Sequence, residues 1–403
     1  MPASARVYTA DRRPSLTAFL SGGFRPFFLA AGLHAAVSLI FWLVWLGVHH
    51  AGGTFVTLSV SPPPYIWHAH EMLFGFAGAA VGGFLLTAVP NWTGHRPVAG
   101  LRLAALVWLW LAGRIALWAS AALPGPVVAG LDLLFLPALV TTLAGPVIRS
   151  GKRQNMAVIA VIALLWVAQI LSHLGMAGIL TDGGRAGRLM ALDVLTLLMT
   201  VIGGRITPAF SRNWLSAQGL PLPPAVPMVP WTPAALTGIL IVLAGDLSAQ
   251  PMLTAAGALL AAVALLVRLA LWQGWRVRSE PLLLVLHLGA LWLGVGYLLR
   301  GLAALSFLPE AASLHALTTG AAGTLVLGVM CRAALGHTGR ALSSSPGLTS
   351  AFALVSLAAL LRVVVPVALP GFYMEGMLVA GAAWVAAFVL YVIHFLPILT
   401  TPR

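Results

Sequence analysis

Charged side chains are scarce in this chain, and acidic ones are the scarcest. Only 8% of its 403 residues are Asp, Glu, Lys or Arg, and nine of these are acidic, whereas 60% of the chain is apolar. The mean hydropathy is high, at +0.98. Because a soluble globule needs more polar surface than this composition provides, we predict an integral membrane protein.

Cysteine and long polar segments are nearly absent as well. The single cysteine, Cys331, excludes an intrachain disulfide and any CxxC metal or redox motif. No polar stretch is long enough for a separate soluble domain, and we expect no removable signal peptide, since no small-residue cleavage site follows an isolated apolar run. The sequence predicts one polytopic membrane domain over 1–403, with a cytoplasmic N-terminal segment at 1–26 and a Pro-rich cytoplasmic loop at 219–234.

Apolar runs of membrane-spanning length fill the rest of the chain. A hydrocarbon core of about 30 Å takes roughly 20 helical residues. By this criterion we predict an all-α fold of about twelve transmembrane helices, near 27–50, 66–90, 99–122, 126–148, 155–179, 187–210, 231–247, 252–273, 281–302, 311–335, 349–369 and 375–399.

The formal net charge of +13 comes mainly from arginines, which are dense in alternate connecting segments. On the sparse side of the predicted topology lie only Arg185, Arg188 and Arg300. Because positively charged loops face the cytoplasm, the pattern predicts that both termini are cytoplasmic. Topology therefore accounts for the charge without a nucleic-acid partner.

A faint internal similarity connects the second and sixth spans. Gly82-Gly83 followed by Asn91-Trp92 recurs as Gly203-Gly204 followed by Asn213-Trp214, at a distance of four helices. Three four-helix repeats would produce this pattern. Glycine pairs also occur wherever transmembrane helices pack closely, so both interpretations stay open.

Histidines are unusually frequent for so apolar a chain, which contains eleven. His68 and His70 begin the second predicted span, His315 begins the tenth, and His173 lies late in the fifth, all at one level. Two imidazoles on parallel helices at matching depth are the usual ligands of a low-spin b-type haem. We therefore predict that His68 or His70, together with His315, holds haem iron.

The spacing of His68 and His70 separates their roles. Residues two apart on a helix point to nearly opposite sides, so one imidazole would bind haem iron and the other would face a copper ion or a proton path. The sequence does not decide which is which. For any single transmembrane histidine, a hydrogen bond to a neighbouring helix is the structural alternative.

Further polar residues qualify as secondary candidates. His287 and His337, nearer the cytoplasmic side, form a possible second metal site. Glu71 lies three residues after His68, on the same helical face, where it would orient an imidazole or pass protons. Asp193 shares the level of Glu71 and is a second candidate for a proton path.

Buried arginines have two interpretations. Haem propionates need charge-assisted partners, and Arg205, Arg268, Arg332 and Arg362 are candidates for that role. Arg332 also lies close enough to a helix end to extend its charge to the membrane surface. Arg114 and Asp132 each lie a few turns from one helical hairpin, and we predict a structural ion pair between them.

Several sequence blocks resemble the NnrS family of bacterial nitric-oxide response proteins. The blocks run in order along nearly the whole chain: FRPFF at 24–28, HAHEMLFGF at 68–76, PNWTG at 90–94, GGRITPAF at 203–210, WQGW at 272–275, HAL at 315–317 and GHTGR at 336–340. The resemblance implies a multi-pass protein of the bacterial cytoplasmic (inner) membrane that binds haem b, with one or two haems and copper left open. It also implies a role in nitrosative stress and denitrification, with nitric oxide as partner and an unknown electron donor.

A weaker resemblance is to the catalytic subunit of haem–copper oxidases and nitric-oxide reductases. There too, a histidine near the outer end of the second helix partners one on the tenth. In this chain the sixth and seventh predicted spans contain no histidine, so the three-histidine metal centre of that family has no place here. Whether the protein is an enzyme stays open; if it is, we expect an oxidoreductase acting on nitric oxide.

Two other classes compete with this prediction. Twelve spans are typical of secondary transporters, but those usually consist of two six-helix halves, and the similarity found here has a period of four helices. A non-catalytic sensor or an assembly factor for metalloenzymes is the third class.

Overall fold

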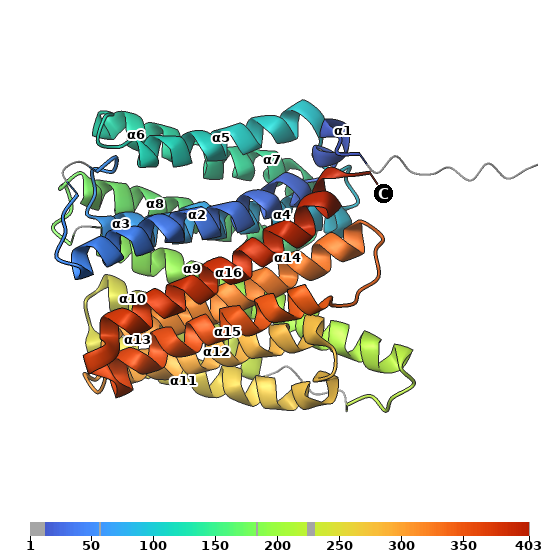
Figure 1. The fold of residues 1–403 in the computed structure, drawn as a ribbon. Coiled ribbons are helices and arrows are strands. Elements are labelled where there is room, and N and C mark those ends of the chain that lie inside the picture. Colours follow the sequence, from blue (N-terminus) through green and yellow to red (C-terminus); the bar gives the residue numbers. More distant parts are fainter. Residues whose placement is uncertain (1–12, 56–57, 183, 224–229, 403) are drawn as a thin grey trace, which may run out of the picture.

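The computed structural model describes residues 13–55, 58–182, 184–223 and 230–402. Throughout these residues the chain forms helices and connecting loops, and no strand (Figure 1). The axes of the long helices are roughly aligned, and they extend between the end of the bundle that holds α3 and α13 and the end where the C-terminus lies (Figure 1).

Eleven helices of the described residues are long and apolar enough to cross a membrane. They are α2 (Phe24–His50), α3–η1–α4 (Pro64–His70, Glu71–Phe76, Ala77–Thr93), α5 (Gly100–Trp118), α6–α7 (Gly125–Asp132, Phe135–Arg149), α8 (Arg153–Met176), α9 (Arg185–Ala217), α11 (Pro251–Leu271), α12 (Pro281–Ala304), α13–η3–α14 (Glu310–His315, Ala316–Gly323, Thr324–His337), α15 (Pro346–Ala368) and η4–α16 (Pro370–Phe372, Tyr373–Thr400).

The seventh predicted span is α10 (Trp231–Leu247), which coincides with the predicted range 231–247 but has 17 residues and falls just short of that length. Two short elements, α1 (Leu16–Phe19) and η2 (Gly274–Val277), complete the chain.

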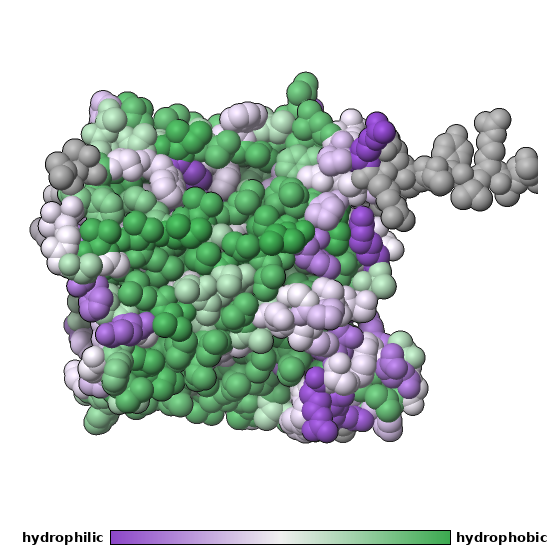
Figure 2. Space-filling view, in the orientation of Figure 1, coloured by the Kyte–Doolittle hydropathy of each residue, from purple (hydrophilic) through white to green (hydrophobic). Residues whose placement is uncertain are grey.

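The surface agrees with this assignment. Figure 2 shows hydrophobic residues over most of the visible face, with many of the hydrophilic ones at the end of the bundle where the C-terminus lies. Large apolar side chains such as Ile393 on α16 and Trp108 on α5 are exposed. Exposure of so much apolar surface to water would be unfavourable, whereas lipid accommodates it. With its eleven apolar helices of sufficient length, the chain is a multi-pass membrane protein.

Small residues allow neighbouring helices to approach closely. A Cβ atom added to Gly238 on α10 would lie 2.6 Å from the backbone nitrogen of Ala261 on α11. Helices α10, α11 and α12 pack consecutively in this way, whereas α2 contacts α4 and, across the whole sequence, α16. Close backbone contact is the usual source of helix association in lipid.

Two π-helical turns interrupt the spans that carry the candidate histidines. Pro63 caps α3, which begins at Pro64, and the π-helix η1 follows directly after His70. The π-helix η3 likewise follows directly after His315. Because π-helical turns are rare and frequently occur at functional sites, their position after His70 and after His315 indicates that both helices contribute to a site.

The cytoplasmic placement of the termini, the three-repeat arrangement and the single-domain organisation stay predictions. Parts of the segment 1–26 and of the loop 219–234 lie outside the described residues, namely 1–12 and 224–229.

Candidate functional site

His68 and His70 point to different parts of the molecule, as their spacing predicts. His68 lines a cavity between the two halves of the chain, whereas His70 lies in a buried polar cluster with Asp132 and His173. We call the cavity that His68 lines the arginine-lined cavity, and the group formed by His70, Asp132 and His173 the His70 cluster. Two histidines of one helix turn therefore belong to two separate sites.

The arginine-lined cavity has a volume of about 590 Å³, within the range of sites for cofactors. His68 of α3 and His315 of α13 both line it, although they are far apart in sequence. Its walls are mostly apolar and come from α2, η1, α9, η3, α15 and α16. The structure thus brings together the two histidines that the sequence paired by depth.

Each of these imidazoles is held by its surroundings. The Nδ1 atom of His315 lies 2.7 Å from the backbone carbonyl of Ala311, one turn earlier. Because a carbonyl only accepts, Nδ1 must carry the proton, which leaves Nε2 as the atom able to bind a metal. The ring of His68 stacks on Trp42 with 4.9 Å between centroids and 9° between planes, and its buried Nδ1 has no hydrogen-bond partner.

Three arginines line the same cavity: Arg185, Arg188 and Arg362. Arg185 forms an exposed ion pair with Glu310, with 2.6 Å between the charged atoms. Arg362 of α15 has a buried Nη1 atom without a hydrogen-bond partner. The cavity therefore combines two imidazoles with a concentration of positive charge.

Of the four arginines predicted as propionate partners, Arg362 lines this cavity, whereas Arg205, Arg268 and Arg332 do not. Arg205 is exposed, and the guanidinium of Arg332 lies over the ring of Phe210, 4.1 Å from its centroid. Arg332 is 17 residues beyond His315 on one continuous span, which corresponds to roughly 25 Å along the helix axis. None of these three arginines is therefore placed to pair with a group bound in the cavity.

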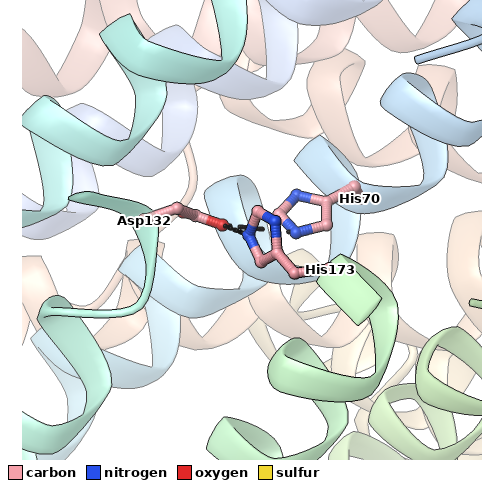
Figure 3. A group of neighbouring side chains, drawn as sticks. All are labelled: His70, Asp132 and His173. Carbon is pink, nitrogen blue, oxygen red and sulfur yellow. Dashed lines mark hydrogen bonds and ion pairs between the residues drawn. The ribbon is translucent and has the colours of Figure 1, made fainter. Parts of the chain in front are cut away.

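The His70 cluster lies within the N-terminal half of the bundle, between α3, α6 and α8. Figure 3 shows the side chains of His70, Asp132 and His173 converging on one point. The Oδ2 atom of Asp132 lies 2.7 Å from Nε2 of His173 and 3.3 Å from Nε2 of His70. All three residues are buried.

Arg114 of α5 joins this cluster to a second carboxylate. Its guanidinium donates to Asp132 through one nitrogen and to Glu71 through the other. The predicted ion pair between Arg114 and Asp132 is confirmed, and it extends to Glu71. Gln169 of α8 donates a further hydrogen bond of 2.9 Å to Oδ2 of Asp132.

Glu71 lies next to the imidazoles of His34 and His70, and not on the face of His68, where its spacing from His68 placed it. Its carboxylate lies 3.0 Å from Nε2 of His34 and 3.8 Å from Nδ1 of His70, and it does not line the arginine-lined cavity. The π-helix begins at Glu71, so the ordinary helical period that placed it on the His68 face no longer applies.

The remaining predicted residues are separate from both sites. His287 contacts the hydroxyl of Ser211 at 2.9 Å, whereas the ring of His337 packs against Phe24 with 5.5 Å between centroids. Asp193 is buried, and its backbone carbonyl accepts a hydrogen bond of 2.8 Å from Thr196.

In the part of the chain that the structure describes, one group of three or more potential metal donors lies within 4.8 Å, and it is the His70 cluster. From the sequence, His70 is a predicted metal ligand, His173 lies at the same predicted level and Asp132 belongs to a predicted ion pair. Spacing along the chain does not predict that the three meet.

These features define a class: a polytopic, all-helical membrane protein with two histidine-containing sites buried among its spans. The family model described as NnrS protein matches residues 18–403, nearly the whole chain. The chain belongs to the NnrS family. Among curated proteins, no relative matches it.

Proposed function

We propose that this protein binds a b-type haem in the arginine-lined cavity, with His68 and His315 as the iron ligands. Through that haem it binds nitric oxide, reduces it or supplies electrons for its reduction, and so limits nitrosative damage at the bacterial cytoplasmic membrane. The observation that carries the proposal is that two histidines from distant helices line one cavity of about 590 Å³.

The polar atoms of the cavity fit such a group. His315 has its Nδ1 proton committed to Ala311, so its Nε2 is the atom available to iron. The unpartnered Nη1 of Arg362 is suited to a propionate, since guanidinium and carboxylate form strong charge-assisted hydrogen bonds. Apolar walls that include Met72 and Met377 suit the macrocycle and exclude water.

The protein residues would divide the work as follows. When bound, haem iron supplies one-electron transfer and, at an open or displaceable coordination position, nitric-oxide binding. His68 and His315 would hold the iron, Trp42 would fix the plane of the His68 ring, and the arginines would neutralise the propionates. Two tightly held imidazoles favour electron transfer, whereas release of one would allow direct chemistry on nitric oxide. In that case the protein is an oxidoreductase.

The test is the visible spectrum of detergent-purified protein in its oxidised, dithionite-reduced and nitric-oxide-treated states, together with its haem content. We expect reduced b-type bands from the wild type, and loss of haem or a changed iron spin state in His68→Gly and His315→Gly. Added imidazole should restore the wild-type spectrum of either variant if the lost side chain is a ligand. His50→Ala removes an exposed histidine at the end of α2 and should change nothing.

Unchanged spectra in both glycine variants would refute the ligand assignment. A shift on addition of nitric oxide would support direct chemistry, and no shift would support electron transfer alone.

The three arginines also favour one alternative, a secondary transporter of an anionic substrate, because they would attract a carboxylate as well as a propionate. Substrate-driven uptake of an organic anion into liposomes by haem-free protein would support that function instead.

A further inference from the structure

The His70 cluster is a second site, separate from the arginine-lined cavity. Its three side chains come from α3, α6 and α8, whereas His315 and Arg362 lie on α13 and α15. No residue of the cluster lines the arginine-lined cavity. A function for haem in that cavity therefore leaves the cluster unexplained.

The donor atoms are those of a transition-metal site. Two imidazole nitrogens and one carboxylate oxygen lie within 4.8 Å of one another, so a single ion could contact all three (Figure 3). Imidazole suits zinc, copper, iron and nickel, whereas magnesium and calcium prefer sites made of oxygen alone. Two histidines with one carboxylate are a frequent set of protein ligands for these ions.

His70 is the member that a hydrogen-bond network does not explain. Its exposed fraction is 0%, yet neither of its ring nitrogens has a hydrogen-bond partner. The Nε2 atom lies 3.3 Å from Oδ2 of Asp132, without the geometry of a hydrogen bond. Buried polar groups normally find partners, so an unpaired imidazole next to a carboxylate is suited to binding an ion that contacts both.

The buried carboxylates in and next to the cluster outnumber the guanidinium that pairs with them. Two carboxylates, Glu71 and Asp132, share the single guanidinium of Arg114. The other groups that contact these carboxylates as ion-pair partners in the described residues are the imidazoles of His34, His70 and His173. Two carboxylates therefore share one guanidinium inside the membrane, where uncompensated charge is costly.

Hydrogen bonds from neighbouring residues hold the carboxylate of Asp132 in place, as is usual for metal-binding side chains. Arg114 and Gln169 fix the carboxylate of Asp132 from two sides. Gly113 lets α6 approach α5 here, since a Cβ atom at that position would lie 2.8 Å from the Cα atom of Asp132. A cavity of about 650 Å³, lined by His34, Arg114 and the loop residue Ser59, offers a route from the surface towards the cluster.

We propose that His70, Asp132 and His173 bind one divalent first-row transition-metal ion at a site distinct from the arginine-lined cavity. The ion brings positive charge next to the two carboxylates and gives the unpaired imidazole of His70 a partner. Arg114 and Gln169 act as positioning residues.

The experiment is metal analysis of purified full-length protein after loading with Zn²⁺ or Cu²⁺ and removal of excess ion over a chelating column. We expect the wild type to retain about one ion per chain, and His70→Gln and His173→Gln to retain none. His287→Gln is the matched control, because this histidine is also buried but contacts Ser211 instead. Gln169→Leu should keep the site but weaken metal affinity by about 10–100-fold.

Haem content is measured in the same samples and should not change in these variants, so the two proposals succeed or fail separately. Should the glutamine variants not accumulate, the electron paramagnetic resonance spectrum of Cu²⁺-loaded wild type decides. Coupling to two imidazole nitrogens supports the site, and a spectrum without nitrogen coupling overturns it. Wild-type protein that retains no ion, or glutamine variants that retain as much as the wild type, would also overturn it.

Discussion

Arg114→Met tests how the buried charges of the N-terminal half stabilise the fold. Arg114 is 5% exposed in its side chain, and its partners Glu71 and Asp132 are 0% exposed, so solvent screens neither ion pair. Removing one member of a buried pair costs about 3–5 kcal/mol, because the remaining charge has no partner. Since this substitution leaves two carboxylates, we expect a loss of about 5 kcal/mol in the free energy of unfolding.

The assay is equilibrium unfolding by sodium dodecyl sulfate in mixed micelles, followed by tryptophan fluorescence without added metal. Adding Glu71→Gln and Asp132→Asn to Arg114→Met removes the uncompensated charges and should recover most of the loss. Arg205→Met removes an exposed arginine and serves as the control. A loss smaller than about 1 kcal/mol in Arg114→Met would refute the reasoning, because only exposed pairs contribute so little.

Two further substitutions have definite expected results. Gly75→Ala would place a Cβ atom 2.3 Å from Nε2 of His34, so we expect a destabilisation of about 1–3 kcal/mol in the same unfolding assay. Gly78→Ala, with no atom within 4 Å of the added carbon, should be neutral or slightly stabilising; equal losses in both would contradict the contact. Arg362→Gln removes a charged donor from the arginine-lined cavity and should weaken haem retention by about 10–100-fold, since such hydrogen bonds contribute about 1.5–3 kcal/mol. Transfer of haem to apomyoglobin measures that retention, and wild-type transfer rates would refute the role.

The helices could be predicted closely because lipid leaves few alternatives. Backbone groups within the membrane must bond internally, so each apolar run of sufficient length becomes a helix. The predicted segment 231–247 coincides with α10, whereas the segment predicted at 187–210 continues as α9 to Ala217. That extension lies beyond the apolar run, where hydropathy carries no information about the end of a helix.

The site was predicted in part. Helical spacing correctly separated His68 from His70, and depth correctly associated His68 with His315 at one cavity. The partners of His70 depend on how α6 and α8 pack against α3, and spacing along one helix cannot specify contacts between helices. Asp132 and His173 could be recognised as candidates, since both are polar residues inside apolar spans. Their contact with each other could not be predicted from the sequence.

The π-helix had no sequence signal. It begins at Glu71, changes the helical period and turns that carboxylate towards His34. Arg362 is one of the four arginines predicted as propionate partners, but the sequence alone does not show that it shares a cavity with His68.

A cryo-electron microscopy map of the purified protein, at a resolution that separates side chains, would test the proposed haem site directly. We predict flat density in the arginine-lined cavity, with the imidazoles of His68 and His315 directed at its centre and Arg362 at its edge. A cavity filled by lipid chains, or haem held by other residues, would contradict this prediction.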